Sequence, residues 1–244
     1  MAIPAPPGYR AVAPFDKTKH RLRGIHAGAQ SFAATLHSFY LTVPEFVPAA
    51  RSYPIVFARD EANLPQPVVL TGLEPGVNLF VQEGRWVPEA YCPAYVRRYP
   101  FHTARVTDPE GRAQSLILVE ESGLDQHAAP VLLDARGEPT PAWDPLRRLI
   151  EDFDAAREQT NEFAKLIDDL GLLEPFEADI NPNAAPRKRL TGMLRVAEVK
   201  LNELPVANLR ELMTRGWLAR LYAHLMSLDN FAALLDREAA RSRS

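Results

Sequence analysis

The spacing of apolar residues changes along the chain and divides it into a strand-like part and a helix-like part. Before about residue 140, short apolar runs alternate with turns rich in glycine and proline, which is typical of strands. Segments 55–59 and 66–71 predict one antiparallel hairpin, and segments 101–107 and 114–120 predict a second, joined by a turn at 108–111. Beyond that part, apolar residues recur every three or four positions, which is typical of helices that bury one face.

The helix-like part begins with a long predicted helix. Asp144 suits its start, an apolar stripe follows, and Gly171 suits its end. A loop at 181–186 then precedes the alternating segment 193–199, which predicts a single strand. Because a lone strand cannot satisfy its own backbone groups, we expect this strand to join the main sheet. Further helices are predicted at 206–214, 217–228 and 229–241.

These patterns predict an α+β fold, with a mostly antiparallel sheet and short helices in the N-terminal part and a helical C-terminal part that adds one strand. Residues 1–145 hold 18 of the 22 prolines and nine of the 12 glycines, so the expected boundary is the stretch 139–145. We therefore distinguish a proline-rich and basic arm (1–20), a β-rich part (21–143) and a helical part (144–244) that we expect to pack on the same core.

The β-rich part contains a faint internal repeat. Segment 48–55 resembles segment 93–101, and the arginine and the Tyr-Pro pair of the two copies are 46 positions apart. Each copy predicts a short helix, a Tyr-Pro corner and a hairpin, because the residue before a proline avoids helical backbone angles. A duplicated αββ unit explains this pattern, and a coincidence of short words explains it almost as well.

The stretch 71–101 concentrates aromatic residues and prolines and predicts two small elements. Its first half predicts a hairpin, with strands at 77–82 and 85–87 around a Glu-Gly turn. Its second half predicts a short helix at 93–99, because proline suits both the first turn of a helix and the position just beyond its end. This helix is the centre of the candidate site.

The chemistry of the short helix lies in its tyrosines and its two adjacent arginines. Tyrosines at i, i+4 and i+8 share one helix face, and two consecutive arginines cannot both point into a core. We expect at least one guanidinium to face outward beside tyrosine edges, a composition that interfaces and anion sites favour. The alternative is a packed core in which one arginine makes an internal ion pair and the other is solvated. The candidate binding residues are Trp86, Tyr91, Tyr95, Arg97, Arg98, Tyr99 and His102.

Weaker candidates lie elsewhere in the chain. His37 and Glu45 could meet across a loop as a base and its orienting group, and Tyr222 and His224 lie together on a predicted helix. The alternative for each is an ordinary structural or surface side chain. We predict no catalytic residue, metal site or cofactor, because hydrolase, zinc-binding, Walker and Rossmann motifs are missing and the single Cys92 excludes a multi-cysteine site.

Composition narrows the class of protein. Apolar residues make up 46% and charged residues 24%, as in soluble globular proteins, and a net charge of −3 argues against nucleic-acid binding by the helical pair at 209–228. No apolar run reaches the ~20 residues of a membrane helix. The start of the chain lacks the features of a secretion signal, so we expect a cytoplasmic protein.

Several short motifs are weak singly and specific as a set. The longest is Tyr91-x-Pro-Ala-Tyr-Val-Arg-Arg-Tyr-Pro-Phe101, and another near the end is Tyr222-Ala-His-Leu-x-Ser-Leu228. The others are Glu45-Phe46, Tyr53-Pro-Ile-Val-Phe57, Gly76-x-Asn-Leu-Phe-Val81 and Gly84-x-Trp86. Together they resemble the bacterial SapC family, the one linked to surface layers, and the resemblance covers most of the chain.

The SapC resemblance implies a role rather than a reaction, because it supplies no catalytic residue. Members are associated with surface-layer loci, and others with genes that resemble flavin-dependent tryptophan halogenases. We therefore expect a non-enzymatic binding, assembly or accessory protein of the surface layer or cell envelope, with a protein partner. The resemblance also implies association at the cell surface as the alternative to a cytoplasmic location. The alternative is an enzyme, or the partner of an enzyme such as a flavin-dependent halogenase, that acts on an anionic small molecule or peptide through Arg97, Arg98 and the tyrosines.

Overall fold

A computed structural model describes residues 4–107, 111–180, 188–241 and 243, and the chain forms two compact units. Unit 1 comprises Met1–Thr35, Val81–Trp86 and Ala94–Ala155, and unit 2 comprises Leu36–Phe80, Val87–Pro93 and Ala156–Ser244. The division does not fall in the stretch 139–145, because the long helix α3 (Trp143–Asp169) contributes residues to both units.

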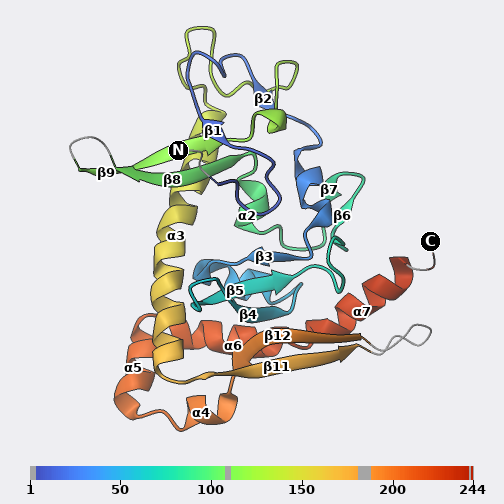
Figure 1. Ribbon diagram of the computed structural model, residues 1–244, viewed down its shortest axis with the longest axis vertical. Coiled ribbons are helices and arrows are strands. Elements are labelled where there is room, and N and C mark those ends of the chain that lie inside the picture. Colours follow the sequence, from blue (N-terminus) through green and yellow to red (C-terminus); the bar gives the residue numbers. More distant parts are fainter. Residues whose placement is uncertain (1–3, 108–110, 181–187, 242, 244) are drawn as a thin grey trace. The chain divides into compact units, whose positions relative to one another are not determined.

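Unit 1 contains a three-stranded antiparallel sheet in the order β1-β9-β8 (Figure 1). The second predicted hairpin is β8 (Phe101–Thr107) and β9 (Ala113–Val119), and β1 (Ala13–Pro14) pairs with β9 on its other side. Most of the predicted turn at 108–111 lies outside the described residues. The other complete elements of unit 1 are β2 (Gly24–Ile25), η1 (Ala29–Thr35), β6 (Val81–Gln82), β7 (Arg85–Trp86), α2 (Ala94–Arg97), η3 (Glu121–Gly123) and β10 (Leu124–Asp125).

The two small elements of the aromatic stretch form, and both are shorter than predicted. In the β6–β7 hairpin, Glu83 and Gly84 have positive φ angles of 51° and 75°, as a two-residue type I′ turn requires. The helix α2 ends at Arg97, because the residue that precedes Pro100 must leave helical backbone angles. The tyrosines at 91 and 99 therefore flank the helix instead of sharing one of its faces.

The core of unit 1 is rich in aromatic rings. The ring of Phe15 stacks on Trp143 at 4.8 Å between centroids and meets Phe101 edge-on at 5.1 Å. Buried Val119 and Ile150 belong to the same cluster, so the first half of α3 packs on the β1-β9-β8 sheet. This core supports the aromatic corner that follows α2.

Unit 2 contains a five-stranded antiparallel sheet in the order β11-β12-β4-β5-β3 (Figure 1). The first predicted hairpin is β4 (Ile55–Arg59) and β5 (Pro65–Leu70), and β3 (Ser38–Tyr40) pairs with β5. The strand predicted at 193–199 is β12 (Lys188–Val196), which joins this sheet as expected by pairing with β4. Both predicted hairpins and an α+β fold are thus confirmed.

The C-terminal part contributes two strands, whereas the sequence predicted one. The additional strand is β11 (Leu173–Ile180). Its acidic residues are typical of a solvated helix face, but Glu174 accepts a hydrogen bond from Arg195 Nε on β12 at 2.9 Å. Pro175 is tolerated because β11 lies at the edge of the sheet. Charge pairing therefore helps to join the edge strand β11 to β12. The loop at 181–186 lies outside the described residues.

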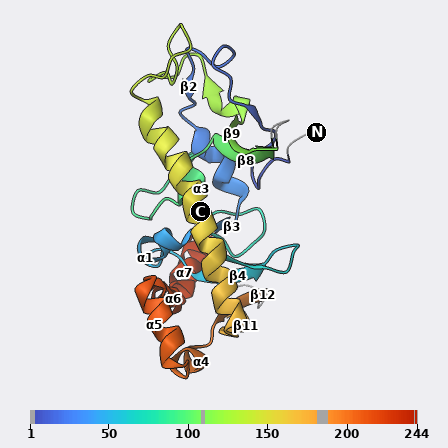
Figure 2. The same cartoon turned by 90° about the vertical axis from the view of Figure 1, so that its left-hand side faces the viewer.

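Helices cover the sheet of unit 2. The helix α3 ends before Gly171, whose φ of 66° suits the left-handed position that closes a helix. The helix α6 contacts β4 and β12, and α5 lies beside α6 (Figures 1 and 2). Phe163 of α3 packs edge-on against Phe46 at 5.6 Å and against Trp217 of α6 at the same distance. The remaining elements of unit 2 are η2 (Val43–Glu45), α1 (Phe46–Ala49), α4 (Glu198–Asn202), α5 (Val206–Thr214), α6 (Trp217–Ser227) and α7 (Asn230–Arg241).

Candidate functional site

The two adjacent arginines of the predicted site have opposite environments. Arg98 is only 2% exposed, and its guanidinium carbon lies 4.1 Å from the ring centre of Phe153 and 4.9 Å from that of Tyr95. Arg97, at the last position of α2, is exposed. A buried guanidinium between aromatic rings is stabilised by cation–π attraction. Arg97 is therefore the solvent-exposed arginine of this pair.

The tyrosines of unit 1 are buried packing residues. Tyr95 donates a hydrogen bond from its hydroxyl to the carbonyl of Pro7 at 2.7 Å, and burial raises its pKa to about 12. Tyr99 stacks on Phe32 with ring centroids 4.1 Å apart, and burial also raises its pKa. Both groups stay protonated at neutral pH, so they can offer ring surface and hydroxyl groups but no phenolate.

Arg97 lies on an open cleft of about 400 Å³ in unit 1. Three segments form the cleft: residues 25–30, the strand β7, and the end of α2 with Tyr99. Figure 1 shows the β6–β7 hairpin beside the blue helix η1, and these elements are in contact. The polar residues that line the cleft are His26, Gln30, Arg85, Arg97 and Tyr99.

The sequence did not indicate His26, Gln30 and Arg85 as site residues. His26 and Gln30 lie far from Arg97 in the chain, and Arg85 occupies the unspecified position of the Gly84-x-Trp86 motif. Gln30 accepts a hydrogen bond from the backbone N–H of Trp86 at 2.7 Å, which ties η1 to β7. Trp86 itself is buried, with 7% of its surface exposed, so it supports the cleft and does not line it. Only the tertiary structure brings these segments together.

Tyr91 belongs to unit 2, whereas Tyr95 and Tyr99 belong to unit 1. Its hydroxyl donates a hydrogen bond to Glu45 Oε1 at 3.0 Å, and its carbonyl accepts a short one from Tyr53. The other carboxylate oxygen of Glu45 accepts hydrogen bonds from the backbone N–H and the hydroxyl of Thr42, at 3.1 Å and 2.7 Å. Glu45 therefore caps the turn that precedes α1.

His224 is a buried structural residue of unit 2. Its Nε2 accepts the backbone N–H of Val196 at 3.0 Å, and its Nδ1 lies 2.8 Å from the carbonyl oxygen of Ile55. These partners assign the ring hydrogen to Nδ1 of a neutral imidazole. Burial lowers the pKa of His224 to about 4, so the ring holds α6 to β4 and β12 without charge at neutral pH.

The remaining candidates are spread over both units. His102, on β8, is half-buried, and its ring centre lies 6.2 Å from that of Tyr9. The carbonyl of His37 accepts the backbone N–H of Thr71 at 2.8 Å, in unit 2. Tyr222 is 38% exposed on α6. Cys92 is half-buried. Within the described ranges, no three His, Cys, Asp or Glu side chains are grouped closely enough to hold a metal ion.

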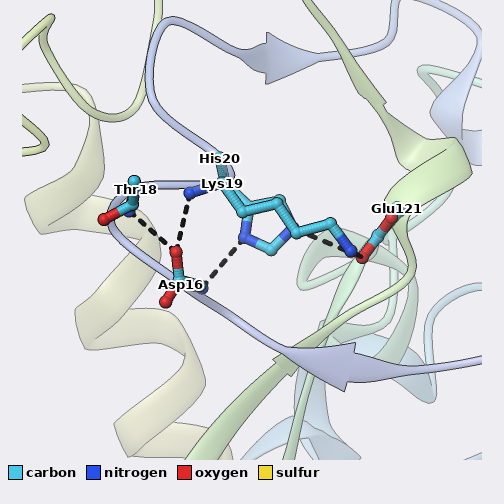
Figure 3. Close-up of polar contacts among 5 residues, drawn as sticks. All are labelled: Asp16, Thr18, Lys19, His20 and Glu121. Carbon is cyan, nitrogen blue, oxygen red and sulfur yellow. Dashed lines mark hydrogen bonds and ion pairs between the residues drawn. The ribbon is translucent and has the colours of Figure 1, made fainter.

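A second polar cluster in unit 1 surrounds the buried His20 (Figure 3). The backbone N–H of Asp16 donates to His20 Nδ1 at 2.9 Å, and His20 Nε2 lies 3.6 Å from Glu121. Asp16 accepts the backbone N–H groups of Lys19 and Thr18, which lower its pKa. An ion pair with Lys19 lowers the pKa of Glu121. These contacts hold the basic segment that follows β1 in place. This cluster is therefore structural, and the cleft beside Arg97 remains the candidate site.

Comparisons with known proteins identify the class. Residues 15–234, nearly the whole chain, match a family model described as SapC. The chain therefore belongs to the SapC family. Searches of curated proteins and of solved structures gave no match. In the described part of the chain, no helix is long and apolar enough to cross a membrane.

Proposed function

We propose that this member of the SapC family is a non-enzymatic binding or assembly protein with an accessory role at the surface layer or cell envelope. Its interaction site is at the C-terminal end of α2 in unit 1. There Arg97 presents a guanidinium to an acidic group of a protein partner. The observation that carries the proposal is the contrast between exposed Arg97 on an open cleft and buried Arg98 beside it.

The environment of Arg97 suits recognition better than it suits catalysis. Arginine offers a planar set of donors that matches carboxylate geometry, and its charge persists at any physiological pH. The tyrosines beside it stay protonated, and His224 is engaged in the core of unit 2. What supports a binding role is thus a permanent cation at the exposed end of α2, in a cleft that Tyr99 also lines.

The test compares three arginine variants of the full chain. Arg97→Ala should keep the melting temperature of the wild type, because the side chain is exposed, and should lose a partner that tagged wild-type protein captures from lysate of its source cells. Arg98→Ala should lower the melting temperature, because it removes a buried guanidinium from two aromatic rings. Arg51→Ala is the matched control, since Arg51 is the exposed arginine at the same position of the other repeat copy in unit 2.

Two results would contradict the proposal. One is that wild-type protein captures no defined partner. The other is that Arg97→Ala captures the same partner as well as Arg51→Ala does, while Arg98→Ala merely unfolds. In that second case the corner would be a packing feature and the partner would bind elsewhere.

A second candidate function rests on the size of the cleft. A volume of about 400 Å³ lies in the range of small-molecule sites, so an enzyme or enzyme partner that acts on an anionic small molecule is the alternative. Turnover of a small anion by the purified chain, with no protein partner present, would favour this alternative over assembly.

A further inference from the structure

The cleft beside Arg97 has an uneven distribution of charge. Two of its nine lining residues are Arg85 and Arg97, and none of the nine, all of which the structure describes, is Asp or Glu. Both arginines are exposed, and they come from different elements, β7 and α2. A concave surface with two guanidinium groups and no carboxylate attracts anions. The charge of the cleft is therefore suited to an oxyanion.

The uncharged polar residues of the cleft are also donors. His26 Nδ1 accepts the backbone N–H of Gly28 at 3.0 Å, so the hydrogen of the neutral ring is on Nε2. The side-chain oxygen of Gln30 accepts the N–H of Trp86, which leaves its NH2 group as a donor. With the two guanidinium groups, these residues form a set of hydrogen-bond donors that matches the acceptor oxygens of a carboxylate or phosphate.

The rest of the cleft is apolar. Ile25, Ala27, Ala29 and Val96 line it beside the ring of Tyr99. Small ligands gain much of their affinity from apolar contacts, while a few polar groups fix their orientation. A ligand that uses the whole cleft therefore combines an apolar body with an anionic group.

A neighbouring cleft of unit 1 provides a contrast. It has about 370 Å³ and shares His26, Ala29 and Tyr99 with the first, but its lining includes a carboxylate, Glu120, in addition to Arg10. Glu120 accepts the backbone N–H of Arg10 at 3.0 Å and the hydroxyl of Ser122 at 2.6 Å. An anion is repelled by this carboxylate, so the first cleft is the one that selects negative charge.

We propose that the cleft between β7 and the end of α2 binds an oxyanion, a carboxylate or phosphate, carried on an apolar body, and that Arg85 and Arg97 are its two cationic contacts. The inference rests on the proposed function, because it names the chemical class of acidic group that the Arg97 corner recognises. Arg85 is the new element, because it places a second guanidinium in the site.

The experiment titrates four small probes into the ¹⁵N-labelled full chain: hexanoate, hexyl phosphate, hexanamide and acetate. Hexanoate or hexyl phosphate should saturably shift the amide resonances of residues 25–30 and 96–99. Hexanamide has the same body without the charge, and acetate has the charge without the body. Hexanamide should bind about tenfold more weakly or worse, since hydrogen bonds to charged groups are the stronger ones. Acetate should also bind about tenfold more weakly or worse, because it loses the apolar contacts of the longer body. Comparison of the two hexyl anions shows which oxyanion the cleft prefers.

Variants assign the contacts. Arg85→Gln and Arg97→Gln should each weaken binding of the preferred hexyl anion by about tenfold or more, and Arg51→Gln in unit 2 should leave it unchanged. Unchanged dispersion of the amide resonances shows that the variants are folded. The proposal is overturned if neither hexyl anion binds, if hexanamide binds as well as they do, or if Arg85→Gln binds like the wild type.

The same variants separate this inference from the proposed function. If partner capture requires Arg97 and tolerates Arg85→Gln, and no hexyl anion binds, the assembly function stands and the oxyanion site fails. If a hexyl anion binds through both arginines but no protein is captured, the oxyanion site stands and the assembly function fails.

Discussion

The two predicted repeat copies make the same three-stranded arrangement, one in each unit. In unit 2, β3 pairs with β5 of the β4–β5 hairpin, and in unit 1, β1 pairs with β9 of the β8–β9 hairpin. A short helix precedes each hairpin, α1 in unit 2 and α2 in unit 1. We call each set of a short helix and three paired strands a module. The shared order of elements supports the proposal that the two modules arose by duplication.

The backbone hydrogen bonds of the two modules also correspond. At the Tyr-Pro corner, the N–H of Leu70 donates to the carbonyl of Pro54 at 3.0 Å, and the N–H of Glu120 donates to the carbonyl of Pro100 at 2.9 Å. The corner therefore has the same pairing in both modules, although the residues around it differ. What the modules share is backbone geometry, and what distinguishes them is side-chain packing.

In unit 2, side chains of the helix α6 hold the strand β4 by hydrogen bonds. Ser227 of α6 accepts the backbone N–H of Ile55 at 2.9 Å, and His224 bonds the carbonyl of the same residue. The strand β4 also pairs with β12, which extends the sheet. In unit 1, the carbonyl of the equivalent Phe101 accepts a hydrogen bond from the Tyr9 hydroxyl at 2.9 Å, and the Phe101 ring meets those of Phe15 and Trp143. The same strand position is therefore held by side chains of a helix in unit 2 and by a tyrosine hydroxyl and aromatic rings in unit 1.

The candidate cleft lies in unit 1, whose core is rich in aromatic rings. Rings around Tyr99 fill the interior of unit 1 while the exposed end of α2 keeps Arg97 at the surface. In unit 2, the residue at the position of Arg98 is Ser52, whose hydroxyl accepts the N–H of Tyr91 at 3.3 Å. We therefore expect substitutions in unit 1 to change binding at the cleft. We expect substitutions of buried hydrogen-bonding residues in unit 2 to change the free energy of unfolding.

The largest expected effect comes from removing one tryptophan in each unit. Trp86 in unit 1 is 7% exposed and Trp217 in unit 2 is 2% exposed. Trp86→Ala and Trp217→Ala should each lower the free energy of unfolding by about 3–5 kcal/mol, because each leaves a large cavity. Denaturant titration measures both, and the Trp→Phe variants, which keep an aromatic ring, should lose less. A loss below ~1 kcal/mol for Trp86→Ala would mean that unit 1 does not depend on its aromatic packing.

An intermediate effect should appear as a pH dependence that originates in unit 2. The folded pKa of His224 is about 4 and its unfolded value is near 6.5, so between these values the unfolded chain binds more protons than the folded one. The stability from neutral His224 is full above pH 6.5 and is lost as the pH falls toward 4, by about 3 kcal/mol. Denaturant titrations at pH 7 and pH 4 measure the loss.

The control for this dependence is His224→Gln. Its amide oxygen can accept the N–H of Val196, but the side chain does not titrate. The variant should be less stable than the wild type at pH 7 and should show a smaller difference between pH 7 and pH 4. If both proteins lose the same stability on acidification, the pH dependence originates in other groups, and His224 is not the source.

The smallest effect is expected from surface ion pairs, one in each unit. Arg59 Nη2 lies 2.8 Å from Asp168 in unit 2, and Lys19 pairs with Glu121 in unit 1. Each pairing lowers the pKa of its carboxyl group, so its contribution is present at neutral pH and is lost as acid protonates that group. Arg59→Ala should cost less than about 1 kcal/mol at pH 7, because the pair is partly exposed. A cost comparable to that of Trp217→Ala would show that this pair, and not the aromatic core, holds unit 2.

Local sequence patterns predict several elements of this protein. The β4–β5 and β8–β9 hairpins, the Glu83-Gly84 turn and the end of α3 before Gly171 follow from alternation, turn chemistry and glycine conformations that act over a few residues. The α+β class and the strand that joins the main sheet follow from the same local patterns. The SapC motifs likewise indicated the family that the whole-chain comparison shows.

The set of residues that line the candidate cleft could not be predicted from the sequence. The sequence required one of two adjacent arginines to face outward, but the rings of Tyr95 and Phe153 decided that Arg98 is the buried one. It placed Tyr91 beside Tyr95, yet the two side chains belong to different units. Arg85 joins Arg97 at the cleft from a separate hairpin. The physical reason is that burial and charge at these positions depend on contacts between segments far apart in the chain, and local sequence patterns do not record such contacts.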